Sequence, residues 1–387
     1  MKMAFSGADM APLGTRLLQR AEHYRDDANT LMDLSTILQL RGMRDVGLAM
    51  QAEALGMQRL YRLPAAGEPA IRLLAIMAPG DLMANTPLEF LVEETDISLD
   101  MLYVDALQAF PGDVPEHDLV FVAVGESEEN HPLLRHIEHA MLAWPRPVLN
   151  RPERIGRLTR DGVCALLTSA PGIVAPTTVR VERKALEQLG QGQRQLAELL
   201  VDSAFPVIIR PVGSHAGHGL MKLASPVAVA DYLAVMPDSE FFLAPFVDYA
   251  GPDGLYRKYR VVLIDGHPYA GHMALSRRWM VHYLNADMLE SSDNRDHEAR
   301  FMAGFDEGFA RRHATAFRAI HERTGLDYLV IDCGETRSGE LLIFEVDTSA
   351  VVHAMDPVEI FPYKQPQMRK VFDAFRDMLA RAAGRLT

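Results

Sequence analysis

Three carboxylates stand at the ends of two apolar runs near the C-terminus, and this pattern constrains the fold more than any other feature. Asp332 closes the run 328–331, and after a short turn the run 341–344 leads to Glu345 and then Asp347. Side chains at positions i and i+2 of a strand share a face, and a hairpin partner brings Asp332 beside them. Carboxylates that converge at the rim of a buried sheet repel one another unless a cation lies among them, and hard oxygen ligands suit Mg²⁺. We therefore predict a β-hairpin that ends in a magnesium site, with a solvated hairpin end as the alternative.

A second short apolar run, residues 205–212, carries one cation and is followed at once by a glycine-rich turn, residues 213–219. Such a turn lets backbone N–H groups approach phosphate oxygens without obstruction by Cβ atoms. The cation is Arg210, whose planar guanidinium can bind a phosphate through two hydrogen bonds. The turn lacks the Lys-Ser/Thr pair of a Walker A loop, and taken alone it is equally a plain hairpin turn. Beside a magnesium site, we interpret it as a phosphate-binding loop.

These two segments, in this order, resemble parts of the ATP-grasp superfamily, most closely its glutathione synthetase, RimK and D-alanine:D-alanine ligase branches. Three further motifs carry the resemblance: Asn150-Arg-Pro152 ahead of a helix, the stretch from Gly172 to Thr178, and the strand 240–248. In the superfamily they are a helix entry, a Gly-Ile-x-x-Pro-x-Thr pattern and the hinge strand that reads adenine through its backbone. The resemblance implies ATP and Mg²⁺ as cofactors, with two ions expected and Mn²⁺ as an alternative.

The patterning divides the chain into three regions, and the fold class is α/β with α+β lobes. Residues 1–66 show helical periodicity and resemble a tetratricopeptide-like hairpin, whose apolar seam must pack on the rest of the chain, a second copy or a partner. Residues 67–152 alternate apolar strands with helices, as in a small parallel-sheet α/β domain that precedes the ATP-grasp lobes. Residues 153–387 would form the ATP-grasp domain, with a nucleotide flap lobe at 176–250 and a metal and substrate lobe at 251–387.

The resemblance also implies which residues form the site. The nucleotide contacts would be Arg160, Arg210, Gly213, Ser214, His215, Gly217, Gly219, Ala244, Phe246 and Asp248. The metal ligands would be Asp332, Glu345 and Asp347, and the carboxylate and acyl phosphate would be held by Arg260, Arg277, Arg278 and Asn285. Preorganised cations at such positions meet the negative charge that phosphoryl transfer spreads over its oxygens. Arg277 and Arg278 are equivalent candidates on this pattern, and for Arg260 an ordinary strand-surface salt bridge is the alternative.

The chain departs from the superfamily pattern at three positions. Arg210 replaces the flap-strand lysine and keeps its charge. Gly162 stands where a lysine usually follows an aspartate, so Arg160 or Arg157 would have to supply that phosphate contact. Asp347 replaces an asparagine, and its extra charge should strengthen the attraction for Mg²⁺ while repelling the triphosphate.

Charge and cysteine content exclude several classes of partner and fold. The formal net charge is -13, which argues against nucleic acid and anionic membranes as partners. Two cysteines, Cys164 and Cys333, are too few for a disulfide framework. Because no apolar run is long enough for a membrane span or a signal segment, we expect a cytoplasmic protein.

The function that these features indicate is an ATP-dependent ligase that forms C–N bonds. Mg-ATP would phosphorylate the carboxylate of a small molecule or peptide, and an amine would attack the acyl phosphate to give an amide, ADP and phosphate. Two alternatives stay open: an ATP-grasp kinase that phosphorylates a small molecule, and a non-catalytic nucleotide-binding adaptor. Association with a protein or with a second copy would involve the N-terminal helices.

Overall fold

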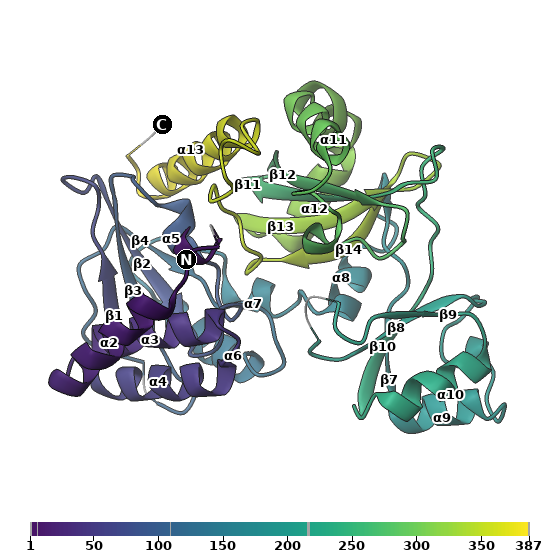
Figure 1. The fold of residues 1–387 in the computed structure, drawn as a ribbon, viewed down its shortest axis with the longest axis horizontal. Helices are drawn as coiled ribbons and strands as arrows, with labels where there is room; N and C mark the ends of the chain where they lie inside the picture. The colour runs from purple at the N-terminus through teal and green to yellow at the C-terminus, as the bar shows by residue number, and fades with distance from the viewer. Residues whose placement is uncertain (1, 6, 109, 215–216, 386–387) are drawn as a thin grey trace.

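The computed structural model describes residues 2–5, 7–108, 110–214 and 217–385, and its strands form three separate sheets (Figure 1). The first sheet has the order β1-β3-β2-β4-β5, with strands Leu60–Leu63 (β1), Ile97–Tyr103 (β3), Ile71–Met77 (β2), Leu119–Val122 (β4) and Val148–Leu149 (β5). The pairs of β2, β3, β4 and β5 are parallel, whereas β1 joins the edge antiparallel to β3. The apolar run of β2 lies in the middle of this sheet, as expected for a parallel strand covered on both faces.

Helices at the N-terminus pack beside this sheet (Figure 1). They are α1 (Lys2–Phe5), α2 (Ala11–His23), α3 (Ala28–Leu40) and α4 (Arg44–Met57), and the same region also contains α5 (Leu88–Leu91), α6 (His131–Met141) and α7 (Pro152–Ile155). Asp27 starts α3 by accepting a hydrogen bond from the backbone N–H of Thr30 at 3.1 Å. The helical region that the sequence predicts is present, and its likeness to a tetratricopeptide unit stays a prediction. Strand β1 lies within the expected 1–66 region but pairs with β3, which belongs to the 67–152 region.

The second sheet belongs to a small lobe at the lower right of Figure 1. Its antiparallel order is β7-β10-β8-β9, with strands Val179–Glu182 (β7), Glu240–Pro245 (β10), Val207–Pro211 (β8) and Met221–Leu223 (β9). Helices α9 (Arg183–Gly190) and α10 (Pro226–Val235) and the short turn η1 (Leu196–Glu198) pack on it. Buried side chains from these strands and helices form a core inside the lobe.

The third and largest sheet has the order β12-β11-β13-β14-β6. Its strands are His267–Ser276 (β12), Tyr256–Ile264 (β11), Tyr328–Glu335 (β13), Leu341–Asp347 (β14) and Ile173–Val174 (β6). The helical elements of this part are α8 (Arg160–Leu167), η2 (Tyr283–Asn285), α11 (Ser292–Ala303), η3 (Asp306–Ala310), α12 (Ala314–Thr324) and α13 (Lys364–Ala382). The β13–β14 pair confirms the hairpin expected from the sequence, and Asp332 lies opposite Glu345 in its register.

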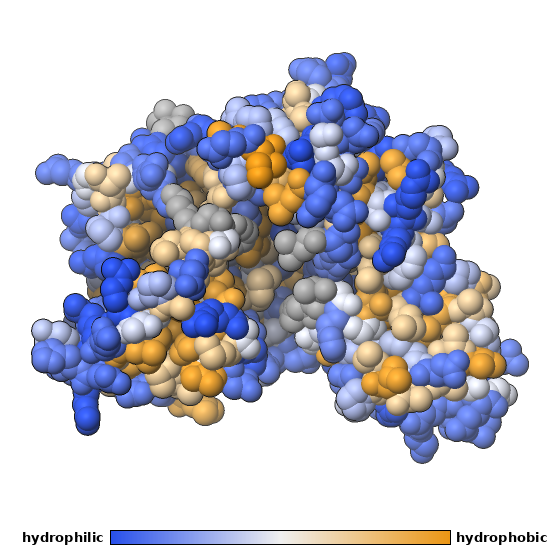
Figure 2. Space-filling model, in the orientation of Figure 1, coloured by the Kyte–Doolittle hydropathy of each residue, from blue (hydrophilic) through white to orange (hydrophobic). Residues whose placement is uncertain are grey.

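Helix α13 joins the first sheet to the third. Phe375 on α13 contacts Phe121 of β4 and Tyr328 of β13, with ring centroids 5.8 and 5.4 Å apart. These aromatic side chains belong to one buried cluster that includes residues of both sheets. Figure 2 shows the surface hollowed between the small lobe and the N-terminal part of the chain. The N-terminal region and the large sheet are therefore one packed body, beside which the small lobe stands.

The α/β fold class predicted from the sequence is confirmed, since parallel strands with helices precede two lobes whose sheets are antiparallel except for the β14–β6 pair. Within the described ranges, no helix has the length and apolar character needed to cross a membrane.

Candidate active site

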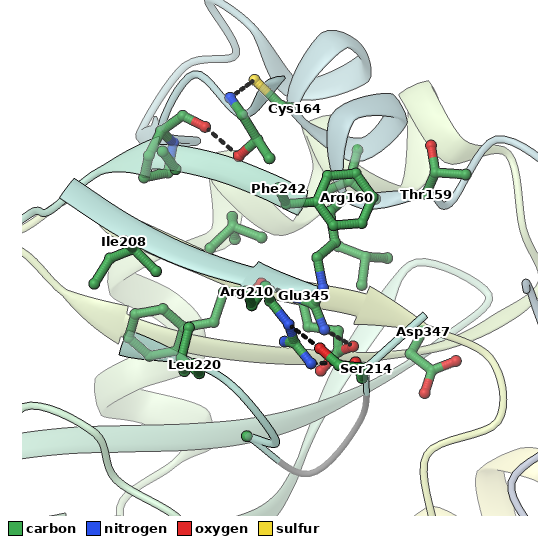
Figure 3. Close-up of a pocket in the computed structure, with 18 of the residues that line it drawn as sticks. Thr159, Arg160, Cys164, Ile208, Arg210, Ser214, Leu220, Phe242, Glu345 and Asp347 are labelled. Atoms are coloured by element: carbon green, nitrogen blue, oxygen red, sulfur yellow. Dashed lines mark hydrogen bonds and ion pairs between the residues drawn. The ribbon is translucent and has the colours of Figure 1, made fainter. Parts of the chain in front are cut away.

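A cavity of about 310 Å³ lies between the small lobe and the large sheet. Strand β8 and the loop after it, the end of β10, helix α8 and the end of β14 all contribute to its walls (Figure 3). The loop after β4 and residues 279–282 complete the lining. Cavities of this kind, mostly apolar with a few convergent polar groups, are the usual sites for small ligands. Residues of the 67–152 region and of both lobes of the 153–387 region therefore meet at this cavity.

Part of the cavity wall is apolar and comes from both the small lobe and the large sheet. Its members are Ile208, Leu220, Phe242, Ala244, Phe246, Trp279, Leu342 and Phe344. The rings of Phe246 and Trp279 meet edge to face with centroids 5.7 Å apart, and Lys222 Nζ lies 3.4 Å from the Phe246 centroid. The two hinge residues that the sequence predicts, Ala244 and Phe246, thus line the cavity in an environment suited to an aromatic base.

Two arginines face the polar part of the cavity (Figure 3). Arg210 on β8 is only 8% exposed, and its guanidinium donates to Ser214 Oγ at 3.0 Å and to the Ser214 carbonyl. Arg160, the first residue of α8, donates from Nη2 to Glu345 Oε1 at 2.6 Å. Burial and, after it, the charge of Arg160 lower the pKa of Arg210 to about 10. Two guanidinium groups that repel each other in a partly desolvated cavity form a site that an anion would stabilise.

The tight first turn of α8 explains why glycine replaces the expected lysine at position 162. Thr159 caps the helix by accepting from the Gly162 N–H at 3.0 Å. A Cβ at position 162 would lie 2.4 Å from the Arg157 carbonyl oxygen, so a larger residue could not fit without moving the backbone. Of the two substitutes that the sequence offers, Arg160 lines the cavity, whereas Arg157 is exposed.

Two of the three predicted metal ligands, Glu345 and Asp347, line the cavity at the end of β14 (Figure 3). Burial would raise the pKa of Glu345, but the charges of Arg160, Arg210 and Lys258 together outweigh it and hold the pKa below its usual range. Burial and the charge of Glu345 raise the pKa of Asp347. One oxygen of Asp347, Oδ1, accepts from the Ser349 N–H and Oγ at 2.8 and 2.9 Å. The two carboxylates therefore repel each other beside an open cavity.

The third predicted ligand, Asp332, is held in an ion-pair network. Its oxygens accept from Arg260 Nε and Nη2 at 2.8 and 3.0 Å, and Lys258 Nζ lies 2.7 Å from Oδ2. Asp332 is 4% exposed. Burial alone would raise its pKa, but the charges of Arg260 and Lys258 outweigh this effect and hold the pKa well below the usual range. Asp332 thus neutralises two cations of β11.

Two carboxylates of the cavity match part of what Mg²⁺ requires of its ligands. Among the described residues, no three Asp, Glu, His or Cys side chains are grouped as ligands of one ion. Glu345 and Asp347 nevertheless fit, because Mg²⁺ is commonly bound through one or two carboxylates together with waters and substrate phosphates. Their mutual repulsion is what a cation would relieve. A metal role for Asp332 stays a prediction.

We expect Asp332→Asn to lower the free energy of unfolding by about 3–5 kcal/mol at pH 7, the cost of leaving buried charges without their partner. The folded pKa of Asp332 is depressed, so its stabilisation is present above the unfolded pKa of about 3.9 and is lost as pH falls through the folded value. Urea denaturation from pH 7 downward checks both statements. The control is Asp248→Asn, which removes an exposed ion pair with Arg337 and should cost about 0–1 kcal/mol. Equal midpoints for the two variants would contradict the assignment.

The other predicted site residues lie partly in the cavity wall and partly outside it. Gly213, Ser214 and Gly217 line the cavity, while His215 lies outside the described residues. Gly219 packs against Pro211, whose Cδ would be 2.6 Å from an added Cβ. The remaining predicted residues are not among the described cavity-lining side chains: Asp248, Arg260, Arg277, Arg278 and Asn285.

Two of those outlying residues have partners that explain their placement. Asp248, the expected ribose contact, accepts from Arg337 Nη2 at 2.9 Å. Asn285 Oδ1 accepts from the His282 N–H at 2.9 Å, and it is His282 that lines the cavity. The structure therefore brings the predicted nucleotide residues together more completely than the predicted substrate residues, whose roles stay predictions.

The polar cavity residues that sequence reasoning missed include His282, Lys258, Glu126 and Glu128. Lys258 was detectable, since it lies two residues before Arg260 on one strand and shares its face. Glu126 and Glu128 follow β4, far along the chain from the other site residues, and no motif marks them. Glu126 accepts from His131 Nε2 at 2.9 Å, and Glu128 pairs with Arg180 of β7.

No protein-family model matches this sequence, and no curated protein matches it. Among solved structures, the chain is similar to D-alanine--D-alanine ligase from Bacillus anthracis complexed with ATP, at TM-score 0.48 and 12% identity over 82% of this chain and 100% of that one. It is also similar to the VanG D-Ala:D-Ser ligase from Enterococcus faecalis, at TM-score 0.47 and 15% identity over 81% and 100%. A RimK domain protein, ATP-grasp, from Sphaerobacter thermophilus gives TM-score 0.45 and 14% identity over 79% and 99%.

At these identities the likenesses concern the fold alone. In this chain a parallel-sheet region is followed by a small antiparallel lobe and a larger lobe, with the cavity between the two lobes.

Proposed function

We propose that this protein is a Mg-ATP-dependent carboxylate–amine ligase that forms an amide through an acyl phosphate. One observation carries the proposal: a single cavity combines an apolar wall, two arginines and two mutually repelling carboxylates. A nucleoside triphosphate has the matching parts, namely an aromatic base, a polyanionic chain and affinity for a divalent cation.

The nucleotide would lie with its base against the apolar wall near Ala244 and Phe246. Its phosphates would face Arg160 and Arg210, whose charges are fixed before substrate arrives. Preorganised cations of this kind stabilise the charge that spreads over the transferring phosphoryl group. Mg²⁺ held by Glu345 and Asp347 would neutralise phosphate charge and orient the chain.

The substrate carboxylate would bind near Lys258 and His282, which line the same cavity. A carboxylate oxygen would attack the γ-phosphorus, the bond from that phosphorus to the ADP oxygen would break, and an acyl phosphate would form. Phosphate is a better leaving group than oxide, so the carbonyl carbon becomes open to attack by an amine. The C–N bond would then form as the C–O bond to phosphate breaks, and the ammonium form of the amine would lose two protons in all.

The amine would approach from the loop after β4. Glu126 and Glu128 supply negative charge there, opposite in sign to the arginine side of the cavity. Burial raises the pKa of Glu126, although His131 acts in the opposite direction. A carboxylate at this position can hold an ammonium group and accept a proton from it.

We expect Glu126→Gln to raise KM for a cationic amine substrate about tenfold or more, because a hydrogen bond to a charged group contributes about 1.5–3 kcal/mol. Hydroxylamine is small and largely uncharged at neutral pH, so its capture by the acyl phosphate should change little. Glu129→Gln, an exposed change in the same loop, is the matched control. Unchanged KM for the cationic amine would remove Glu126 from the proposed site.

The proposed activity is tested by incubating the protein with Mg-ATP, hydroxylamine and a panel of carboxylic acids. Hydroxamate that forms together with ADP, and only when a particular carboxylate is present, supports the ligase. Carboxylate-independent ADP release, or an alcohol that takes the phosphoryl group, contradicts it and favours the kinase alternative.

A further inference from the structure

The loop after β2, residues 78–86, reaches the cavity from the N-terminal side. Met83 lines the cavity. The side chain of Asn85 holds the start of the loop, since its Oδ1 accepts from the Ala78 N–H at 2.7 Å and its Nδ2 donates to the Ala78 carbonyl at 2.8 Å. The Ala84 carbonyl accepts from the Gly125 N–H at 2.8 Å. The loop is thereby tied to the segment that carries Glu126.

The same loop is bonded to the end of β14. The buried side chain of Thr86 donates from Oγ1 to the Thr348 carbonyl at 2.8 Å. Thr348 lies between Asp347 and Ser349, and Ser349 makes the two hydrogen bonds that orient Asp347. A Cβ on Gly125 would lie 2.8 Å from Ser349 Oγ, so these segments are in close contact. Movement of residues 78–86 would therefore displace the carboxylate end of the cavity.

Helix α4 holds this loop through one buried side chain. Gln51 Nε2 donates to the Gly80 carbonyl at 2.9 Å, and the Gly80 N–H donates to Gln51 Oε1 at 2.8 Å. Gln51 is 8% exposed, so it satisfies both backbone groups of Gly80 in a place that water reaches poorly. Arg44 also pairs with Asp81 at 3.0 Å, but both groups are substantially exposed and such pairs contribute little. Gln51 is thus the main polar connection from the helices to the loop.

We propose that Gln51 is a positioning residue for the cavity, through which the N-terminal helices brace the carboxylate end of the site. The brace runs from Gln51 to Gly80, along the loop to Thr86, and through Thr348 to Asp347. The inference rests on the proposed function only where it treats Asp347 as a metal ligand. It gives the N-terminal helices a part in building the site, without contact between them and the nucleotide.

The test substitutes Gln51→Met, which keeps the length of the side chain and removes both hydrogen bonds. We expect amide hydrogen exchange at Gly80 and Gly125 to accelerate about tenfold or more, as when a buried hydrogen bond is lost locally. Mn²⁺ affinity in the presence of saturating ADP, measured by electron paramagnetic resonance, should fall several-fold. ADP affinity without metal should stay unchanged. The control is Gln58→Met. Gln58 follows the last residue of the same helix and donates to the Leu60 carbonyl at 2.5 Å, so it does not bond to the loop after β2 through this contact.

Gly80→Ala provides a second route to the same displacement without altering α4. An added Cβ would lie 2.7 Å from Ala84 Cβ, and the φ of Gly80 is one that L side chains rarely adopt. The Gly80→Ala variant should show the same faster amide exchange at Gly125 and the same loss of Mn²⁺ affinity. If Gln51→Met fails to fold, Gly80→Ala provides the test of the proposal. If Gln51→Met accelerates amide exchange at Gly80 but leaves both the exchange at Gly125 and the Mn²⁺ affinity unchanged, the proposed brace is wrong. If the wild-type protein binds no Mn²⁺ in the presence of ADP, the proposed function is contradicted. The comparison of amide exchange at Gly125 between wild type and variants would still test whether Gln51 braces the site.

Discussion

Asp347→Ala and Glu345→Gln should each reduce turnover by about two orders of magnitude or more at saturating ATP, the effect expected when preorganised charge is lost from a phosphoryl-transfer site. Both carboxylates line the cavity, and they are the residues that we propose to hold Mg²⁺. Steady-state ADP release with the carboxylate and amine found by the hydroxylamine screen measures the effect. Glu340→Gln, in the turn of the same hairpin, should leave turnover near that of the wild type.

In the absence of metal, the charge of Asp347 lowers the stability of the fold. The folded pKa of Asp347 is raised by burial and by Glu345, so the ionised carboxylate destabilises the fold, and this penalty grows as pH rises from the unfolded pKa through the folded one. Asp347→Asn removes the charge and should raise the melting temperature of the metal-free protein at neutral pH. Adding Mg²⁺ and ADP should reduce the difference in melting temperature between Asp347→Asn and the wild type. Near-native turnover in Asp347→Ala and Glu345→Gln, or a lower melting temperature in Asp347→Asn, would contradict the metal assignment.

The second large effect concerns the two arginines. Arg210→Ala and Arg160→Ala should each weaken ATP binding about tenfold to a hundredfold, since each removes hydrogen bonds to a charged group worth about 1.5–3 kcal/mol. Arg210→Lys should retain most of the affinity, because a point charge also binds phosphate. Titration calorimetry with ATP, performed with and without Mg²⁺, measures the change.

Arg157→Ala is the matched control for this pair. Arg157 is exposed, and it was the other candidate for the phosphate contact that Gly162 cannot supply. Its replacement should leave ATP affinity unchanged. Equal affinity in wild type and Arg210→Ala would show that β8 is not a nucleotide strand, and a loss confined to Arg157→Ala would reverse the choice of Arg160.

Local sequence patterns were sufficient for much of the fold and of the nucleotide side. The β13–β14 hairpin follows from two apolar runs around a turn, and its register places Asp332 opposite Glu345 as expected. Arg210 and the glycines after β8 were recognisable because strand, cation and turn are contiguous. Arg160 was one of two candidates, and the tight turn at Gly162 separates it from Arg157.

Contacts between distant segments could not be read in the same way. The role of Asp332 as a counter-ion depends on the β11–β13 pairing, which brings Arg260 directly opposite it. Asp248 sits near the expected ribose position in sequence, but Arg337 from the β13–β14 turn binds it. The apolar seam of the N-terminal helices predicted that these helices pack against another surface. The hydrogen bonds between Gln51 and Gly80 could not be predicted, because they depend on how α4 docks against the loop after β2. Such pairings become visible only when the register and docking of the elements are known.

Transfer of oxygen from the substrate carboxylate to phosphate tests the central proposal most directly. The carboxylate found by the hydroxylamine screen is labelled with ¹⁸O at both oxygens and incubated with the protein, Mg-ATP and the amine. The released phosphate is then analysed by mass spectrometry. An acyl phosphate requires that each phosphate released during amide formation carry one ¹⁸O atom, with ADP and amide formed in equal amounts. Phosphate without the label, or a phosphoryl group that remains on the substrate, would contradict the ligase mechanism.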